Sequence, residues 1–196
     1  MTRSTTTATS SIIRISDEVR DALASNQAVV ALESTIFSNL GLPSPANAQA
    51  LTNCIAAIRE AGAIPAITAV IDGVARVGIN ESEHERILGP AKKVGEREIA
   101  LAIAQHWSVG ATTVSASLLL ASRAGIGVFA TGGIGGVHRD SHLHGDISAD
   151  LGALAAHPVV TVCAGAKSRS RRRAPRCPST EEQETEKRKW ILNSTR

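Results

Sequence analysis

The sequence predicts a three-layer α/β/α fold in which helices cover both faces of a mixed, mostly parallel sheet. Short apolar runs of strand length alternate with segments of helical spacing, which is the pattern of βαβ units. The run at 28–32 is continuously apolar, as expected for a strand that is covered on both faces. The pair Asp72-Gly73 followed by VARVG is a hairpin signal, so at least one pair of strands should be antiparallel.

Each helix is expected where a capping residue precedes apolar residues at helical spacing. In chain order, the expected helices are 17–24 after Ser16, a helix from Pro45 to Gly62 after Ser44 as N-cap, a short charged helix after Asn80, 96–106, 117–124 and 148–156 with Ser148 as N-cap. Strands are expected at apolar runs bounded by turn residues. They are 28–32, 64–71, the run after Gly73, 92–94, 111–115, 127–130 and a buried strand at 159–163.

Length and composition indicate one globular domain at 15–168, between a disordered N-terminus at 1–14 and a charged, disordered tail at 169–196. The chain has 196 residues, of which 43% are hydrophobic and 20% are charged. The net charge of +3 arises mainly in the last roughly thirty positions. The tail is also compatible with a nuclear-import or nucleic-acid patch.

Composition also bounds the compartment and the partners. The three cysteines are far apart and lack C-x-x-C spacing, which favours a reducing, cytoplasmic location, although the acid-free first fifteen residues also fit an organellar transit peptide. No apolar run reaches the ~18 residues of a membrane span. Aromatic residues make up only 2%, so nucleic-acid binding by base stacking is not expected.

The stretch 131–151 concentrates glycines, histidines and aspartates after the strand predicted at 127–130. Glycine at such a strand end allows positive φ and lets N–H groups converge on a phosphate; a tight turn explains the glycines equally well. A dinucleotide-binding fingerprint is not expected, because its third glycine falls on His138. Metal binding is a second possibility, and a solvated polar loop is the alternative. The candidate ligands are His138, His142, His144, Asp146 and Asp150.

Two ionisable residues lie just beyond the ends of predicted strands. Glu33 follows the run 28–32, where desolvation would raise its pKa and make it usable as a proton donor or acceptor. A salt-bridged or exposed acid is the alternative. Lys167 follows the strand 159–163, where a dry pocket would favour the neutral amine and Schiff-base formation. An exposed lysine at the start of the basic tail is the alternative.

Several long motifs in one order resemble the pseudouridine-5′-phosphate glycosidase family, also called indigoidine synthase A-like. They are VVALESTI at 29–36, the P-x-P-x-N segment at 43–47, GATTV at 110–114, VFATGGIGGVHR at 128–139, DISADL at 146–151 and VTVCAGAKS at 160–168. The resemblance implies an α/β/α enzyme, usually a homotrimer, that requires Mn²⁺. Such an enzyme reversibly cleaves the C–C glycosidic bond of pseudouridine 5′-phosphate to uracil and ribose 5-phosphate.

The resemblance also implies roles for particular residues. Glu33 would be the proton donor, Lys167 the nucleophile that forms a Schiff base with C1′ of the opened sugar, and Asp146 the metal ligand. The residues implied to contact substrate are Lys93, Val114, Ser148, Ala149 and Asp150. For Lys93, a solvated surface position is the alternative.

The charged tail departs from the family, which continues past the lysine with further strands and helices. A truncation by a frameshift, a retained intron or an altered stop is the hypothesis for this tail. Two alternative functions follow: an inactive fragment that acts at most as a binding or assembly partner, and another Schiff-base lyase or aldolase acting on phosphosugars.

Overall fold

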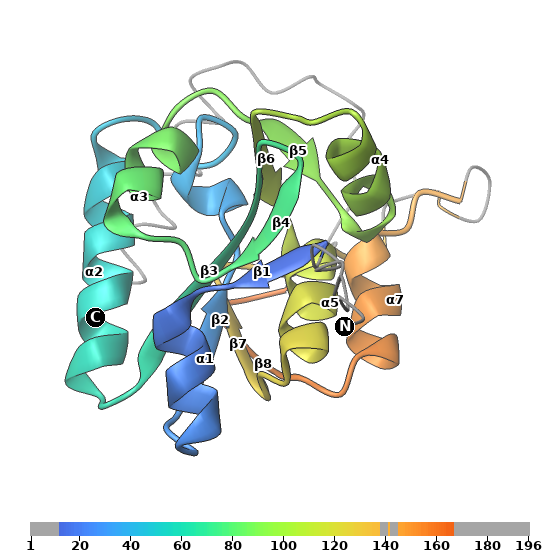
Figure 1. Cartoon of the computed structure of the whole chain (residues 1–196). Coiled ribbons are helices and arrows are strands. Elements are labelled where there is room, and N and C mark those ends of the chain that lie inside the picture. Colours follow the sequence, from blue (N-terminus) through green and yellow to red (C-terminus); the bar gives the residue numbers. More distant parts are fainter. Residues whose placement is uncertain (1–11, 138–140, 142–144, 167–196) are drawn as a thin grey trace, which may run out of the picture.

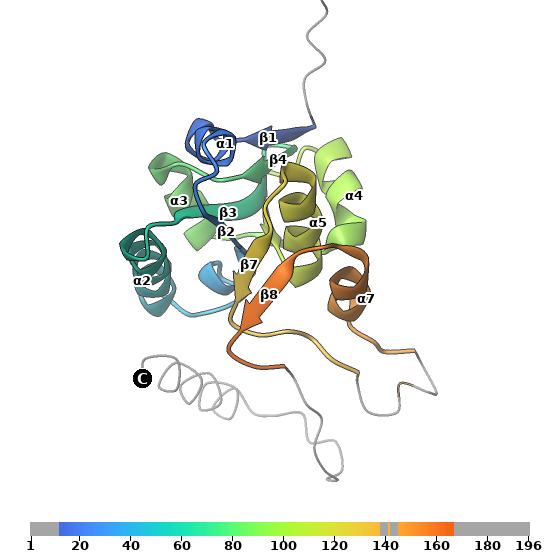
Figure 2. The ribbon, with the colours of Figure 1, turned by 90° about the horizontal axis from the view of Figure 1, so that it is seen from below.

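A computed structural model describes residues 12–137, 141 and 145–166 of the chain. One central sheet lies between two groups of helices (Figure 1). One group is α2 (Ala46–Glu60) and α3 (Glu81–Leu88); the other is α4 (Ile99–Ala104), α5 (Val114–Ala124) and α7 (Ala149–Ala156). The buried residues of α1 (Asp17–Ala24) belong to the same core cluster as those of the second group. Figure 2 shows the same two groups from a perpendicular direction. The predicted three-layer arrangement is therefore confirmed.

The sheet of the described residues is mixed and mostly parallel, as predicted. Its strands are β1 (Ile13–Ile15), β2 (Val29–Leu32), β3 (Ile64–Ile71), β4 (Val74–Val77), β5 (Lys92–Val94), β6 (Val109–Thr112), β7 (Val128–Thr131) and β8 (Val160–Cys163). Their order is β1-β4-β3-β2-β7-β8, with β6 also beside β3 and β5 beside β6. The pairings of β3 with β4 and with β6 are antiparallel, and the other pairings are parallel.

Strand β3 connects the two parts of the sheet. Its first half, 64–67, pairs with β2, and its second half pairs with β4 on 68–71 and with β6 on 69–71. Alternate residues face opposite layers: Ala66 and Val70 belong to one buried cluster, and Ile67 and Ile71 belong to another. This explains why the run 64–71 is apolar on both faces apart from Thr68.

Local signals place the helices and the hairpin where they were predicted. The side chain of Ser16 accepts a hydrogen bond at the start of α1, Ser148 does so at the start of α7, and Asn80 forms a capping box with Glu83 at the start of α3. Two 3-10 turns, η1 (Thr35–Phe37) and η2 (Glu96–Glu98), also occur, and η2 forms the first part of the helix predicted at 96–106. The turn at Asp72 and Gly73 has positive φ at both residues.

The structure corrects three details of the sequence prediction. Helix α2 begins at Ala46 with Pro45 as the capping residue and without a side-chain cap, so the prediction of Ser44 as N-cap is wrong. Strand β6 ends at Thr112, and α5 begins three residues before the predicted start. The strand at 159–163 is not buried, since β8 is the last strand in the order and its residue Val160 is 66% exposed.

The described part of the chain extends into the segment assigned to the N-terminus. Residues 13 and 14 form β1 together with Ile15 and pair with β4. None of the helices in the described ranges has the length and apolar character that crossing a membrane requires.

Candidate active site

The carboxyl ends of β2 and β7 bring Glu33 and Thr131 together. The two strands are parallel neighbours in which Leu32 pairs with Ala130, so the residues that follow them are adjacent at the same edge of the sheet. The hydroxyl of Thr131 donates a hydrogen bond to Oε1 of Glu33. This edge is the place where α/β sheets position their ligands.

Glu33 is a buried acid, with only 8% of its surface exposed. Burial raises the pKa of its carboxyl group from 4.5 to about 7, because the charged form loses its hydration. The hydrogen bond from Thr131 opposes this rise, the negative charge of Asp150 adds to it, and the positive charge of Lys93 lowers the pKa. The predicted desolvation is confirmed, and the charges of two other predicted site residues, Asp150 and Lys93, act on Glu33.

A network of buried hydroxyl groups lies directly beside Glu33. Thr112 Oγ1 donates to the carbonyl oxygen of Thr68 at 2.7 Å, and the amide of Thr112 donates to Ser34 Oγ at 2.9 Å. Thr68 Oγ1 lies 2.9 Å from Ser117 Oγ, whose hydroxyl donates to the carbonyl oxygen of Thr113. Because these hydroxyl groups are buried and hydrogen-bonded, they fix the strand ends on which Glu33 stands.

Asp150 connects the loop after β7 to the start of α5. Its Oδ2 accepts from the amide of Gly135 at 2.9 Å, and its Oδ1 accepts from the amide of Ser115 at 3.2 Å. Its own amide donates to Ser148 Oγ. Its carboxylate is thus held beside the helix start that contains Val114, which is buried. Ala149, the first residue of α7, is exposed.

Gly135 of this loop serves close packing rather than positive φ. A side chain at Gly135 would place Cβ 2.2 Å from Ser148 Oγ and 2.9 Å from Asp150 Oδ2, and neither Gly133 nor Gly135 has positive φ. The amide of Gly133 donates to Thr131 Oγ1. Two of the N–H groups proposed for a phosphate cradle are therefore bonded to side chains of the protein.

Two of the remaining predicted residues are exposed, and the others lie outside the described residues. Lys93 is exposed on β5, where it pairs with Ala111 of β6. Asp146 is exposed in the segment before α7. Within residues 12–137, 141 and 145–166, no three His, Cys, Asp or Glu side chains gather closely enough to hold a metal ion. Lys167 and the three candidate histidines His138, His142 and His144 lie outside the described residues.

Several residues of this site were not predicted. Thr131 and Thr112 each end a strand, and Ser34 comes two residues after the end of β2. Thr131 meets Glu33 through the register between β2 and β7, and Thr112 meets Ser34 because β6 runs antiparallel to β3. Both contacts join segments that are distant in the chain, so no local pattern in the sequence reveals them.

Comparisons with known proteins identify relatives of this chain. Residues 18–170 match the family model described as indigoidine synthase A like protein. The chain is 51% identical over 159 residues to pseudouridine-5′-phosphate glycosidase of Myxococcus xanthus, covering 80% of this chain and 52% of that protein. It is 49% identical over 161 residues to the protein of the same name from Escherichia coli, covering 80% and 51%. The chain thus spans about half the length of the curated relatives it matches.

Solved structures give a consistent result. The prealnumycin C-glycosynthase AlnA, in complex with ribulose 5-phosphate, matches with a TM-score of 0.71 and 38% identity, over 80% of this chain and 50% of that one. An indigoidine synthase A-like protein from Thermotoga maritima matches with a TM-score of 0.68 and 33% identity, over 79% and 49%. These neighbours have the α/β fold described above. The chain belongs to the family of indigoidine synthase A like proteins.

Proposed function

We propose that this chain carries the chemistry of a pseudouridine-5′-phosphate glycosidase, the reversible cleavage of pseudouridine 5′-phosphate to uracil and ribose 5-phosphate. The observation that supports it most directly is the buried carboxyl group of Glu33. It accepts a hydrogen bond from Thr131, and the charges of Asp150 and Lys93 act on it. Relatives that are about half identical to this chain have that name.

Glu33 is suited to donate a proton near neutral pH. With a pKa of about 7, a large fraction of its carboxyl groups is protonated at that pH, and the carboxylate left after donation can be protonated again. The Thr131 hydroxyl holds one carboxyl oxygen, which leaves the other for the substrate. Cleavage of a C–C bond requires such a proton, because the uracil carbon leaves as a carbanion equivalent.

In the proposed reaction, Lys167 is the nucleophile. Its neutral amine forms a bond to C1′ as the C1′–O4′ bond of the ribose ring breaks, and the ring oxygen takes up the proton that the amine loses. When the bond from C1′ to uracil breaks, its electron pair passes to the uracil carbon, which takes the proton from Glu33. The nitrogen lone pair forms the C=N bond at C1′, and water then hydrolyses the imine to release ribose 5-phosphate and the free amine.

Other residues are proposed to bind the substrate. Lys93 is a cation suited to the phosphate, while Ser148, Ala149 and Asp150 at the start of α7, together with Val114, would position the sugar. Mn²⁺ is proposed as the cofactor, with the Asp146 carboxylate as a ligand; when bound, the metal would supply Lewis-acid stabilisation of oxygen atoms on the substrate. A homotrimer is proposed from the family resemblance, and a cytoplasmic location from the cysteine pattern.

The experiment is the reverse reaction, in which uracil and ribose 5-phosphate are incubated with the chain and Mn²⁺ while uracil absorbance is followed. We expect coupling by the wild type, none by Lys167→Arg and a strong loss in Glu33→Gln. Lys93→Ala should raise KM for ribose 5-phosphate. Its matched control is Lys92→Ala. Lys92 lies on the same strand, but its Nζ lies over the Trp107 ring, 4.6 Å from the ring centre.

Borohydride trapping tests the covalent step separately. Reduction in the presence of ribose 5-phosphate should add the mass of the reduced sugar adduct at Lys167. Trapping without coupling would instead indicate another imine-forming lyase. A soluble, folded chain that shows neither result would contradict the proposed function and leave a binding or assembly role.

A second candidate is C-glycoside synthesis with an acceptor other than uracil. It is favoured by the 38% identity to AlnA, which is named a C-glycosynthase and was crystallised with ribulose 5-phosphate. Coupling of ribose 5-phosphate to a different acceptor, together with trapping at Lys167 and no coupling of uracil, would support this candidate over the first.

A further inference from the structure

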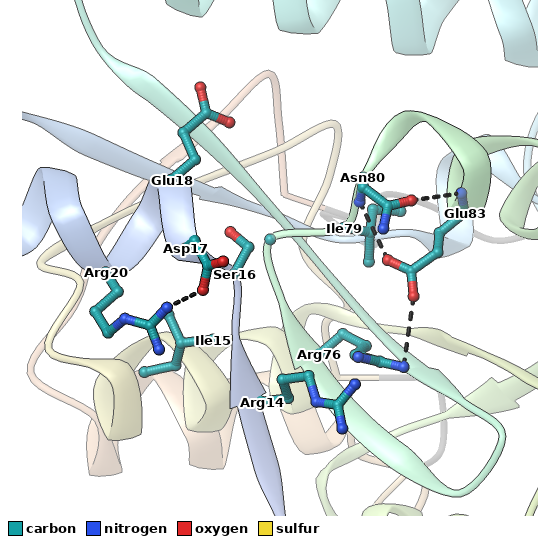
Figure 3. A pocket seen from close by; sticks show the side chains of 11 residues that line it. Arg14, Ile15, Ser16, Asp17, Glu18, Arg20, Arg76, Ile79, Asn80 and Glu83 are labelled. Atoms are coloured by element: carbon teal, nitrogen blue, oxygen red, sulfur yellow. Dashed lines mark hydrogen bonds and ion pairs between the residues drawn. The ribbon is translucent and has the colours of Figure 1, made fainter.

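A cavity of about 550 Å³ lies between strands β1 and β4 and the first turns of helices α1 and α3 (Figure 3). None of the residues predicted for the active site lines it. Its volume falls in the range of small-molecule sites. Any ligand that it holds is therefore independent of the function proposed above.

Two arginines line this cavity at the same level of neighbouring strands. Arg14 of β1 and Arg76 of β4 are directly paired in the parallel register, so their side chains leave the sheet on the same face. Figure 3 shows both guanidinium groups beside the cavity. Two positive charges on neighbouring strands repel each other, and an anion bound between them would relieve this repulsion.

The acids around the cavity are mostly engaged with other groups. Asp17 is paired with Arg20, and Glu18 accepts two hydrogen bonds from Arg59, at 2.6 and 3.0 Å. Glu83 accepts a hydrogen bond from the backbone amide of Asn80 at 3.1 Å. The acidic side chains at the rim are therefore already bonded to cations or amides of the protein.

The two arginines, in contrast, use little of their hydrogen-bonding capacity. Within the described part of the chain, Arg14 makes no side-chain hydrogen bond or ion pair. The Arg76 side chain is only 16% exposed. Among the described residues its one ion pair, with Glu83, is 3.5 Å long, and its buried Nε has no acceptor there. A guanidinium group offers five donors in a planar fork, which suits an anion with several oxygens.

The backbone around the cavity favours negative charge as well. Helices α1 and α3 both begin at its rim, and the partial positive charge of a helix N-terminus attracts anions. Gly78 makes this arrangement possible: it has positive φ, and a Cβ there would lie 2.3 Å from Ser16 Oγ. The start of α1 can therefore pack directly on the end of β4.

We propose that this cavity binds a phosphate group between Arg14 and Arg76. A tetrahedral anion with several oxygens can accept hydrogen bonds from two guanidinium forks at once, which a monatomic ion such as chloride cannot do. The cavity is larger than a free phosphate ion, so the group can be the free ion or part of a small phosphorylated metabolite.

Calorimetric titration of the full chain with inorganic phosphate, at constant ionic strength and mildly alkaline pH, tests this site. We expect binding by the wild type and a loss of about tenfold or more in affinity in Arg14→Gln, the size expected for one charge-assisted contact. Arg76→Gln should have a similar effect. The matched control is Arg123→Gln, which removes the same charge from an exposed position on α5 and should leave the affinity unchanged.

Arg14 is exposed, so its variant should fold even if replacement of the more buried Arg76 disturbs the structure. Absence of phosphate binding at millimolar concentration would overturn the proposal. Binding that survives Arg14→Gln but is lost in Lys93→Ala would also overturn it, because the phosphate would then occupy the Glu33 site. Glycerol 3-phosphate serves as a second probe: tighter binding than phosphate, again dependent on Arg14, would support a phosphorylated metabolite, and equal binding would support the free ion.

Discussion

Replacement of Glu33 by glutamine should change how the stability of the protein depends on pH. Glutamine has the shape of the protonated acid and can still accept the hydrogen bond from Thr131, but it cannot ionise. The folded state holds the proton of Glu33 up to about pH 7, whereas the unfolded state releases it near 4.5. Between these values the folded state binds more protons, so the stability of the wild type falls as pH rises.

The magnitude follows from the two pKa values of 4.5 and about 7. At about 1.4 kcal/mol for each pH unit of difference, the buried charge costs the wild type about 3 kcal/mol once the pH is well above 7. Between roughly pH 5 and pH 8, this one group lowers the free energy of unfolding by about 2.5 kcal/mol. Glu33→Gln removes this contribution, so its stability should be nearly equal to that of the wild type at the lower pH and higher at the upper pH.

Urea denaturation of both proteins at the two pH values measures this difference. Glu85→Gln is the matched control, because Glu85 is exposed on α3 and its replacement should leave the pH dependence of the wild type intact. If Glu33→Gln lost as much stability as the wild type between the two pH values, Glu33 would not be a desolvated acid. The argument for its role as a proton donor would then fail.

Three further predictions concern the surroundings of this acid and the edge of the sheet. Thr112→Val removes a buried hydroxyl from the network and should lower the free energy of unfolding by about 1–3 kcal/mol; a loss within experimental error would show that the network contributes nothing. Gly135→Ala places Cβ 2.9 Å from Asp150 Oδ2 and should reduce kcat of the coupling reaction by about tenfold, whereas Gly127→Ala, with open space around it, should have no effect. Val162→Lys puts a charge on the face of β8 where Val162 is 58% exposed; it should weaken self-association in sedimentation experiments, and unchanged association would exclude β8 as the contact.

Features that depend on a few neighbouring residues could be predicted from the sequence. Ser16, Asn80 and Ser148 cap helices through bonds to amides two or three positions away, so their pattern is visible in the chain itself. The hairpin at Asp72-Gly73 is equally local, because both residues take positive φ in the turn. These signals, together with the apolar runs, were enough to predict the three layers.

Features that depend on distant pairings could not be predicted in the same way. The exposure of β8 follows from its position at the end of the strand order, which no local pattern reveals. Glu33 could be identified because it follows a buried strand directly. Its partner Thr131 lies 98 positions further along the chain, and only the register between β2 and β7 brings the two together. Gly135 was noticed, but its reason is the proximity of Asp150 rather than backbone conformation.

The long strand β3 has a consequence for how the molecule opens. Since its first half is bonded to β2 and its second half to β4 and β6, neither part of the sheet can separate without breaking bonds of the same eight residues. Local opening should therefore spare its amides, and they should exchange with deuterium only when the whole protein unfolds. Glu33 at the end of β2 and the cavity between β1 and β4 are thus both attached to one cooperative folding unit.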